Sequence, residues 1–393
     1  MSCLFVHDFR SYRVKDDVYT TNLSYTILRE RYVNVFGNVN ILNRSGKLER
    51  SQDKKGLVKA SGDFVNFIDE IGIFTPISFF RDYYKIKKIV VSHVANAEYT
   101  IIRLDSFLGL IAARYCRKHN KKYLIEIVGC VWDSFWNKGF WGKMVALPLY
   151  KKMKHAIRNA PYVVYVTHDF LQKRYPTNGQ NTNISNVYLK PLEESMLVQR
   201  LYKIENFDSE HIYEIVTIAS VEVRYKGQET VIRALAYLKK LGQNNFRYHL
   251  IGGGDDSFLR KLSSDLNVSD QVIFHGSLNH EQVMDFLNDA DIYIQPSKQE
   301  GLPRSLIEGM SRGLLCYGTN VAGIPELLSP EMLISRKRNN YIELAEKLSK
   351  IDRDLCKDQA QKNFAKAKRY EGPILDEKRK CFFRAFKEQI KYE

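Results

Sequence analysis

The chain has 393 residues, and its 60 lysines and arginines outnumber 45 aspartates and glutamates, which gives a formal net charge of +15. At about 150 residues per domain this length predicts two domains, and no segment reaches the ~18 consecutive apolar residues that a membrane-spanning helix needs. The cysteines form no CxxC pair, which disfavours a disulfide framework or a zinc cluster. The positive charge leaves three partner classes open, namely nucleic acid, an anionic membrane surface and a phosphorylated small molecule.

The first half of the chain alternates short apolar segments with segments of helical length. The opening MSCLFVHDFR has an apolar run too short for a signal peptide, and we expect a first strand there rather than an export signal. Further strand candidates are VNIL, KKIVVSH, TIIRL, KYLIEIVG and YVVYVT, whose continuous apolar character is typical of a parallel sheet buried on both faces. Between two of them, FLGLIAARYCRKH places Leu108, Ile111 and Tyr115 on one helical face, which predicts a βαβ unit.

The alternation stops around residues 190–210 and then resumes. KPLEESMLVQRLYKIENFDSEH is polar and acidic, as expected at a domain boundary. YEIVTIAS, RYHLIGGG, QVIFHGS, DIYIQPS and LLCYG then predict a second doubly wound α/β domain. The last segment, ILDEKRKCFFRAFKEQIKYE, predicts a basic amphipathic helix with Phe382, Phe383 and Phe386 toward one side. We expect it to dock on the protein body, with membrane or partner binding as the alternative.

Residues 300–313, EGLPRSLIEGMSRG, place two glutamates around a predicted helix start. Pro303 suits the first turn and Gly313 the position just past the end, so a helix is expected roughly from 303 to 312. Its first amides favour a phosphate, and Glu308 points back toward them, where its carboxylate can accept hydrogen bonds from two ribose hydroxyls. Glu300 would face the other end of that ligand. The alternative is a Glu308–Arg304 pair with Glu300 as a solvated loop acid.

Three further patterns in the second half bear on binding. Arg224 and Lys226 stand at a predicted helix start, where the dipole opposes cations, so a bound diphosphate would offset the cost; ordinary exposed basic residues are the alternative. LIGGGDD lets the backbone approach a ligand near Gly253, although it lacks the spacing of a dinucleotide fingerprint or a P-loop. The D-x-D spacing of Asp289 and Asp291 spans a helix end and a buried strand, so we expect no metal.

PSKQEGLPRSLIEGMSRGLLCYGTNVAGIPELL closely resembles the donor-site signature of glycosyltransferase family 4 (group 1), retaining enzymes of the GT-B fold, with its E-x7-E motif, glycine-rich turn and Pro-Glu-Leu. KGQETVIRAL, LIGGG and VIFHGSL are similar to the same family in order and spacing. The resemblance implies two Rossmann-like doubly wound domains facing across a cleft. The acceptor-binding domain would span 1–195 and the nucleotide-sugar-binding domain 196–370, with a helix over 371–393 packing back on the first domain.

By this resemblance Glu308 would bind the nucleotide ribose, Glu300 the donor sugar and Lys226 the diphosphate. Glu300, Lys226 and Arg224 are then the catalytic candidates, because the protein must stabilise charge on the departing diphosphate. The expected donor site is completed by Gly253, Gly301, Leu302, Arg304, Ser305 and Leu306. The chain departs from the family where many members have a Gly-Arg pair, here Ala-Ser at 219–220. The first domain also lacks both the usual glycine pair after strand one and a His after YLIEIVGCVWD.

Polar residues at predicted strand ends of the first domain are the acceptor-side candidates. They are His7, Asp8, Arg103, Asp105, Glu126 and Asp133, each with a structural role as the alternative. All tryptophans fall within 132–158, and that stretch is rich in lysine and has no acid after Asp133. Such a stretch is typical of an interfacial surface on an anionic membrane and suits a lipid-linked acceptor. An acceptor-cleft wall followed by a solvated basic helix is the alternative.

We therefore expect a retaining glycosyltransferase that moves a sugar from a nucleotide diphosphate sugar, with UDP as the expected nucleotide. The acceptor would be a saccharide or a polyprenyl-diphosphate-linked saccharide, in surface polysaccharide assembly at the cytoplasmic face of the membrane. We expect no cofactor and no metal. The rivals are a nucleotide-sugar epimerase or hydrolase on the same fold and a non-catalytic nucleotide-binding member. A nucleic-acid-binding protein would leave the donor motif unexplained.

Overall fold

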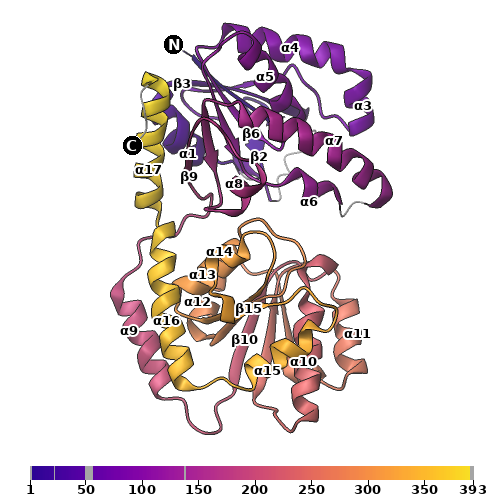
Figure 1. The fold of residues 1–393 in the computed structure, drawn as a ribbon, viewed down its shortest axis with the longest axis vertical. Helices are drawn as coiled ribbons and strands as arrows, with labels where there is room; N and C mark the ends of the chain where they lie inside the picture. The colour runs from indigo at the N-terminus through magenta and orange to yellow at the C-terminus, as the bar shows by residue number, and fades with distance from the viewer. Residues whose placement is uncertain (1, 22, 49–55, 137–138, 390–393) are drawn as a thin grey trace. The chain divides into compact units, whose positions relative to one another are not determined.

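The structure is a computed structural model that describes residues 2–21, 23–48, 56–136 and 139–389. The chain divides into two compact units (Figure 1). Unit 1 comprises residues 1–186 and 375–393, and unit 2 comprises residues 187–374, so the division after Asn186 lies upstream of the boundary expected at 195. Each unit is built on a largely parallel sheet with helices packed on it, which confirms the expected α/β class with two Rossmann-like domains.

The sheet of unit 1 has the order β4-β2-β1-β6-β7-β8-β9, and β3 pairs with both β1 and β5. The long first strand serves several partners, because Cys3–Val6 pair with β6 in parallel and Ser11–Val14 pair with β2 in antiparallel fashion. The strands are β1 (Ser2–Val14), β2 (Asp17–Thr20), β3 (Asn38–Lys47), β4 (Val58–Lys59), β5 (Val65–Ile68), β6 (Tyr99–Leu104), β7 (Tyr123–Ile127), β8 (Tyr162–Tyr165) and β9 (Gln180–Asn183). Every residue of β6, β7 and β8 is buried, as their continuous apolar sequences predict.

The helices of unit 1 cover this sheet. They are α1 (Tyr25–Leu28), α2 (Asn34–Phe36), α3 (Pro76–Arg81), α4 (Tyr83–Asn96), α5 (Phe107–Lys118), α6 (Val131–Trp136), α7 (Gly139–Arg158), α8 (Phe170–Arg174) and most of α17 (Gly372–Glu388). The strand predicted at KKIVVSH is wrong, because this segment lies inside α4. Ile86, Val90 and Val94 recur every four residues and are buried, whereas the neighbouring lysines are exposed, so the period is helical rather than extended.

The predicted docking of the last helix on the protein body is confirmed. Phe382, Phe383 and Phe386 of α17 are fully buried. The ring centroid of Phe383 lies 5.9 Å from that of Tyr32, and the ring centroid of Phe386 lies 5.3 Å from that of Tyr162. These partners belong to the first unit, so the aromatic stripe of the helix closes one side of its core.

The sheet of unit 2 is entirely parallel, with the order β12-β11-β10-β13-β14-β15. Its strands are β10 (Tyr213–Ile218), β11 (Phe246–Ile251), β12 (Val272–Gly276), β13 (Ile292–Gln295), β14 (Leu315–Thr319) and β15 (Leu333–Ile334). Its helices are α9 (Glu194–Glu205), α10 (Gln228–Lys240), α11 (Ser257–Asp265), α12 (His280–Asp289), α13 (Arg304–Ser311), α14 (Ile324–Leu327), α15 (Asn340–Leu348) and α16 (Arg353–Ala367). The chain winds outward from β10 to β12 and then returns to β13 on the other side of β10. Ligands of such sheets bind at this switch point, beyond the carboxyl ends of the strands.

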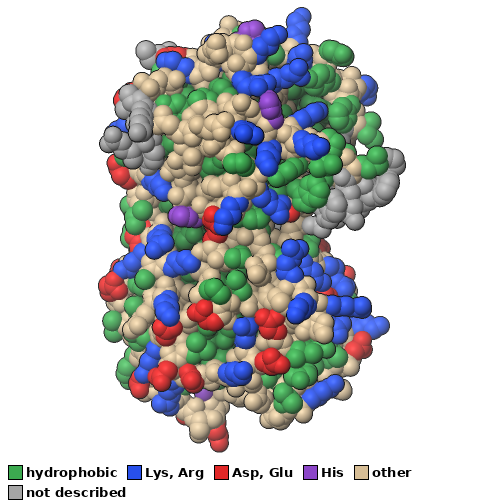
Figure 2. All heavy atoms as spheres, viewed as in Figure 1, with side chains coloured by type: hydrophobic (Ala, Val, Ile, Leu, Met, Phe, Trp, Pro, Cys, Tyr) green, Lys and Arg blue, Asp and Glu red, His purple; other side chains and the backbone are tan. Residues whose placement is uncertain are grey.

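Figure 2 shows lysine and arginine side chains interspersed with acidic ones on the face in view, rather than gathered in one block. Among the described residues, no helix combines the length and apolar character that crossing a bilayer requires.

Candidate functional site

The carboxyl ends of β10 and β13 carry the residues that the sequence singled out in unit 2. After β10, a short 3₁₀ turn, Arg224–Lys226, leads into α10. After β13, a loop that contains Glu300 leads into α13, which begins at Arg304, directly after Pro303. Gly313 has a φ of +65°, so the helix ends just before it, as the sequence predicts.

Glu300 and Lys226 form the central ion pair of this site. Lys226 Nζ lies 2.6 Å from Glu300 Oε1, and the two side chains are 23% and 11% exposed. The same oxygen accepts hydrogen bonds from Gln295 Nε2 at 3.0 Å and from Ser297 Oγ at 2.8 Å. Among the described residues no contact is found for Glu300 Oε2, so one oxygen is held by the protein and the other can accept a ligand hydroxyl.

Gln295, the last residue of β13, holds this carboxylate in place. It is buried, and its amide oxygen accepts hydrogen bonds from the hydroxyls of Tyr293 at 2.8 Å and Ser305 at 3.4 Å. Its amide nitrogen donates to Ser297 Oγ at 2.9 Å as well as to Glu300. Sequence reasoning missed Gln295, Ser297 and Tyr293. The available signal was the run of polar groups in YIQPS at the carboxyl end of an otherwise apolar strand.

Glu308 lies in the second turn of α13 with 5% of its surface exposed. Burial raises the pKa of its carboxyl above the ordinary value, and the charges of His280, Arg304 and Arg312 offset this only in part. The nearest basic side chain among the described ion pairs is His280, whose Nδ1 lies 3.7 Å from Glu308 Oε1; a Glu308–Arg304 pair is not found there. A buried acceptor without a close partner is costly, which favours a ligand that donates hydrogen bonds to it.

The remaining predicted donor residues lie around these glutamates. Gly301, Leu302, Arg304, Ser305 and Leu306 form the loop and the first turn of α13, whose first amides have no acceptor within the helix. Gly253 lies close to another loop, since a Cβ added there would be 2.4 Å from Ser277 Oγ. Gly227, between Lys226 and α10, has a φ of +76°, and an added Cβ would lie 2.0 Å from the carbonyl oxygen of Pro296. Glycine therefore lets the two loops of the switch point touch.

Arg224 is not directed to the same carboxylate as Lys226. Its guanidinium lies 3.3 Å from Glu229 and stacks on Phe258, with 3.2 Å between Cζ and the ring centroid. Arg224 and Lys226, which lie in the same short turn, thus form ion pairs with different carboxylates, and their spacing in the sequence did not predict this.

Comparison with known proteins identifies the family. Residues 203–369 match the family model described as "Glycosyl transferases group 1". Protein CapJ of Staphylococcus aureus is 31% identical over 340 residues, which cover 86% of this chain and 83% of that protein. The chain belongs to the group 1 glycosyltransferases. The putative colanic acid biosynthesis glycosyltransferase WcaL of Escherichia coli is 33% identical over 125 residues, 30% of each protein.

Solved structures show that this glycosyltransferase has the GT-B fold. Sucrose-phosphate synthase of Thermosynechococcus elongatus aligns with a TM-score of 0.67 at 15% identity, covering 99% of this chain and 100% of that one. HepE of Anabaena in complex with UDP aligns with a TM-score of 0.63 at 13% identity, covering 96% and 98% of the two chains.

In unit 1 of the glycosyltransferase, the candidates Asp8 and Asp105 line one cavity of about 230 Å³. Asp8 is buried and caps α5, because its carboxylate accepts hydrogen bonds from Ser106 Oγ at 2.8 Å and from the amides of Phe107 at 2.6 Å and Leu108 at 3.0 Å. Burial raises the pKa of its carboxyl, and these hydrogen bonds lower it less. Asp8 therefore holds the start of α5 in place, independently of any ligand in the cavity.

Arg103 and Glu126 are buried against each other. Arg103 donates from Nε at 3.0 Å and from Nη2 at 2.9 Å to Glu126 Oε2, and the Tyr32 hydroxyl joins both residues. Burial would raise the pKa of Glu126, but the charges of Arg103 and Arg379 and the hydrogen bonds outweigh it and hold the pKa below its ordinary value. Arg103 was a candidate for acceptor contact, and the structure engages its guanidinium inside unit 1.

His7 and Asp133 occupy different surroundings. His7 Nδ1 accepts a hydrogen bond from the Phe9 amide at 3.0 Å, and burial, with the charges of Arg103 and Arg44, lowers its pKa to about 3. The ring is therefore neutral with its proton on Nε2, a buried atom without a partner among the described residues. Asp133 pairs with Arg174 at 3.0 Å.

The predicted membrane surface at 132–158 is described only in part. Trp132 packs edge-on against Tyr150, with 5.9 Å between ring centroids. The side chains at 134–141 and at 143 lie outside the described residues, so the predictions for two tryptophans and two lysines there stay predictions. The later part of α7 buries Met153 and Ile157 and exposes the lysines between and before them.

Proposed function

We propose that the glycosyltransferase binds a nucleotide diphosphate sugar, with UDP as the nucleotide, at the switch point of unit 2. The sugar would pass, with its anomeric configuration retained, to a saccharide or a polyprenyl-diphosphate-linked saccharide in surface polysaccharide assembly. The observation that carries the proposal is Glu308, a buried carboxylate one turn inside α13. Side chains of a helix tilt toward its N-terminus, which brings this carboxylate toward the first amides of α13.

Each part of such a donor has a matching group. The two ribose hydroxyls can donate to Glu308, and the amides at the start of α13 with Lys226 suit the diphosphate. Glu300 can accept a hydroxyl of the sugar through Oε2 while its other oxygen stays fixed by Gln295 and Ser297. Binding of the donor by these groups requires no metal ion and no cofactor.

The chemistry asked of the protein is electrostatic. Negative charge develops on the diphosphate as the sugar leaves, and a cation and amides that are already oriented stabilise it. Retention requires the acceptor hydroxyl to approach on the face from which the diphosphate departs, so the acceptor must be positioned rather than merely bound. We assign this positioning to unit 1, where His7 Nε2–H is a buried donor without a partner among the described residues and Asp8 and Asp105 line a cavity.

The names of relatives support the pathway. WcaL is named for colanic acid biosynthesis, and AmsK of Erwinia amylovora, 34% identical over 26% of this chain and 27% of that protein, for amylovoran biosynthesis. HepE was solved with UDP, which supports the nucleotide. The exposed side chains of Met144 and Leu147 on α7, followed by exposed lysines, support association of the protein with the inner face of an anionic membrane.

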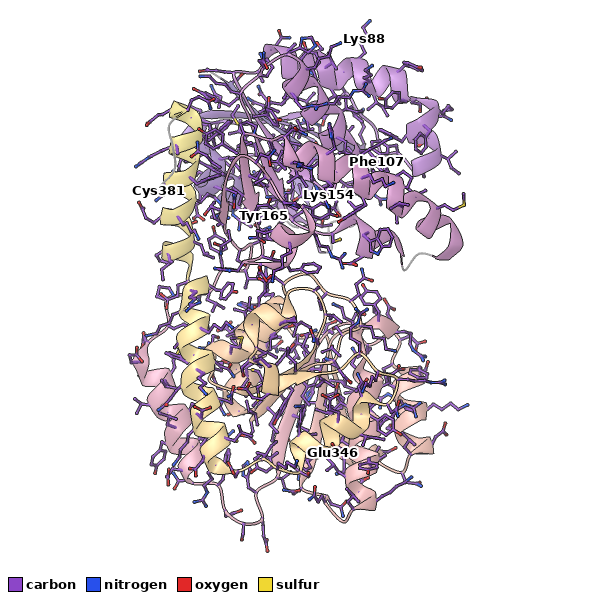
Figure 3. All side chains as sticks on the ribbon, in the orientation of Figure 1. Lys88, Phe107, Lys154, Tyr165, Glu346 and Cys381 are labelled. Carbon is purple, nitrogen blue, oxygen red and sulfur yellow. The ribbon has the colours of Figure 1, made fainter. Side chains whose placement is uncertain are left out.

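The test is calorimetric binding of UDP, GDP, ADP and CMP to the wild type and to Glu308→Gln. Glu346→Gln is the matched control, because it removes the same charge from an exposed position of unit 2 (Figure 3). We expect UDP to bind best and to weaken by about tenfold or more in Glu308→Gln, since a charged acceptor of two hydrogen bonds becomes neutral. If the two variants bind UDP with equal affinity, Glu308 is not part of the site. If the wild type binds no nucleotide, the proposal is contradicted.

A further inference from the structure

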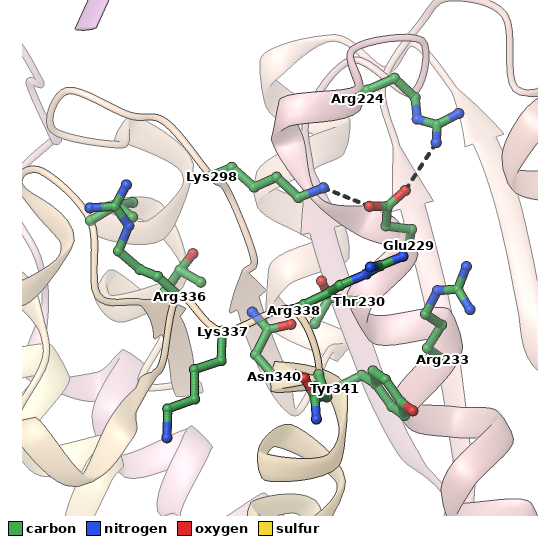
Figure 4. A pocket seen from close by; sticks show the side chains of 13 residues that line it. Arg224, Glu229, Thr230, Arg233, Lys298, Arg336, Lys337, Arg338, Asn340 and Tyr341 are labelled. Carbon is green, nitrogen blue, oxygen red and sulfur yellow. Dashed lines mark hydrogen bonds and ion pairs between the residues drawn. The ribbon is translucent and has the colours of Figure 1, made fainter. Parts of the chain in front are cut away.

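Unit 2 contains a cavity of about 730 Å³ whose lining does not include Lys226, Glu300 or Glu308 (Figure 4). One wall is the start of α10 with the turn before it, and the other is the loop that leads from β15 into α15. Its cationic lining residues are Arg224, Arg233, Lys298, Arg336, Lys337 and Arg338. Thr230, Thr319, Asn339, Asn340 and Tyr341 add polar groups.

The acid Glu229 neutralises only part of this charge. It lies 2.6 Å from Lys298 Nζ and 3.3 Å from Arg224 Nη2, as the dashed lines in Figure 4 mark. Within the described part of the chain, Arg233 and the three consecutive cations at 336–338 have no carboxylate at ion-pair distance. Positive charge from two walls thus meets in one cavity, and the described part of the protein compensates only part of it.

The backbone adds to this field. The helices α10 and α15 both begin at the cavity, so the positive ends of two helix dipoles lie beside it. Asn339, at the start of α15, makes no side-chain cap hydrogen bond. Clustered cations at helix N-termini repel one another and oppose the dipoles, and a bound anion removes both costs.

We propose that this cavity is a second anion site, which takes a compact, soluble ligand bearing two or more phosphate groups. Guanidinium groups present planar forks that match phosphate oxygens, and cations on both walls require a ligand with more than one anionic group. The threonine and asparagine lining suits hydroxyls or phosphate oxygens rather than an acyl chain. Its lining residues do not include Lys226, Glu300 or Glu308, and its existence does not depend on the nucleotide site proposed above.

The probe is inorganic triphosphate, titrated into the full chain by calorimetry at increasing NaCl concentration. In the wild type we expect binding that weakens with salt, as for an electrostatic ligand. The variant R336Q/K337Q/R338Q replaces three exposed loop side chains, so far-UV circular dichroism should be unchanged. Its affinity should fall by about tenfold or more, because charge-assisted hydrogen bonds are lost.

Two further variants make the test specific. K85Q/K87Q/K88Q removes the same charge from exposed positions of α4 in unit 1, where Lys88 projects from the helix (Figure 3), and should bind within about twofold of wild type. Lys226→Gln removes the cation of the other site and should leave binding at the cavity intact. The proposal is overturned if the wild type does not bind triphosphate at physiological salt, or if both triple variants lose affinity equally. Loss of all binding in Lys226→Gln would overturn it as well.

Discussion

Replacing Glu126 by Gln tests whether Arg103 is part of the framework of unit 1. Glu126 and Arg103 are 6% and 9% exposed, and two hydrogen bonds of 2.9–3.0 Å join them. Gln keeps the shape but removes the charge that compensates Arg103 and the nearby buried Arg379, whose pKa burial and the charge of Arg31 already lower to about 10. Breaking a buried pair in this way costs about 3–5 kcal/mol, a large part of the about 5–15 kcal/mol that holds a domain together.

The assay is urea unfolding followed by tryptophan fluorescence, which reports unit 1 alone because Trp132, Trp136 and Trp141 all belong to it. The midpoint multiplied by the urea dependence gives the free energy of unfolding, and its difference from the wild-type value gives the cost of the substitution. The control is Asp17→Asn, which breaks the exposed pair with Lys59 and should leave the midpoint close to that of the wild type. If Glu126→Gln is as stable as this control, Arg103 is free for an acceptor and the structural interpretation fails.

Two other perturbations are expected to act on stability. Burial lowers the pKa of the His7 imidazole from 6.5 to about 3. As the pH falls, the unfolded chain therefore binds a proton at His7 before the folded chain does. The contribution of His7 to the stability of unit 1 is complete above pH 6.5 and is lost as the pH falls toward 3. His7→Gln should therefore flatten the pH dependence of the fluorescence midpoint below 6.5, and an unchanged slope would contradict the buried neutral ring. Gly227→Ala meets the Pro296 carbonyl oxygen at 2.0 Å and should cost more than about 2 kcal/mol, whereas Gly242→Ala, with a similar φ of +78° and nothing within 4 Å, should cost about 1 kcal/mol. Urea unfolding of the full chain followed by far-UV circular dichroism, compared with the tryptophan fluorescence of unit 1, measures the two costs. Equal costs would mean that the loop contact yields easily.

What the sequence predicts well is local. Pro303 directly precedes α13, and Gly313 follows its end within two residues, so both ends of the helix follow from nearby residues in the sequence. The burial of the face that carries Glu308 follows in the same way. The central strands of both sheets follow from runs of buried residues in the same way, whereas β2, β4, β5, β9 and β15 are short and were not predicted. The segment 87–93 shows the limit, because β-branched residues indicate a strand while the spacing of the buried positions in α4 is that of a helix.

What the sequence does not predict depends on where distant side chains meet. Arg224 and Lys226 are two residues apart, yet Glu229 and Phe258 attract one and Glu300 the other. Only the packed sheet determines which acid each cation reaches. To predict that Gln295 of β13 holds Glu300, one must know how the end of the strand is aligned with the following loop. Secondary-structure propensity carries no information about that alignment.

The pair of Lys226 and Glu300 also shows how the charge of the lysine is compensated within unit 2 at a small electrostatic cost. Lys226 has three ammonium hydrogens, and its contact with Glu300 engages one of them, so a diphosphate can be bound without breaking the pair. Gln295 and Ser297 hold the carboxylate through the same oxygen, so its orientation does not depend on the lysine. Removing Lys226 would therefore leave Glu300 correctly placed but uncompensated beside an incoming diphosphate. The loss in donor affinity would then combine a missing attraction with a new repulsion, and would exceed the loss from neutralising both partners together.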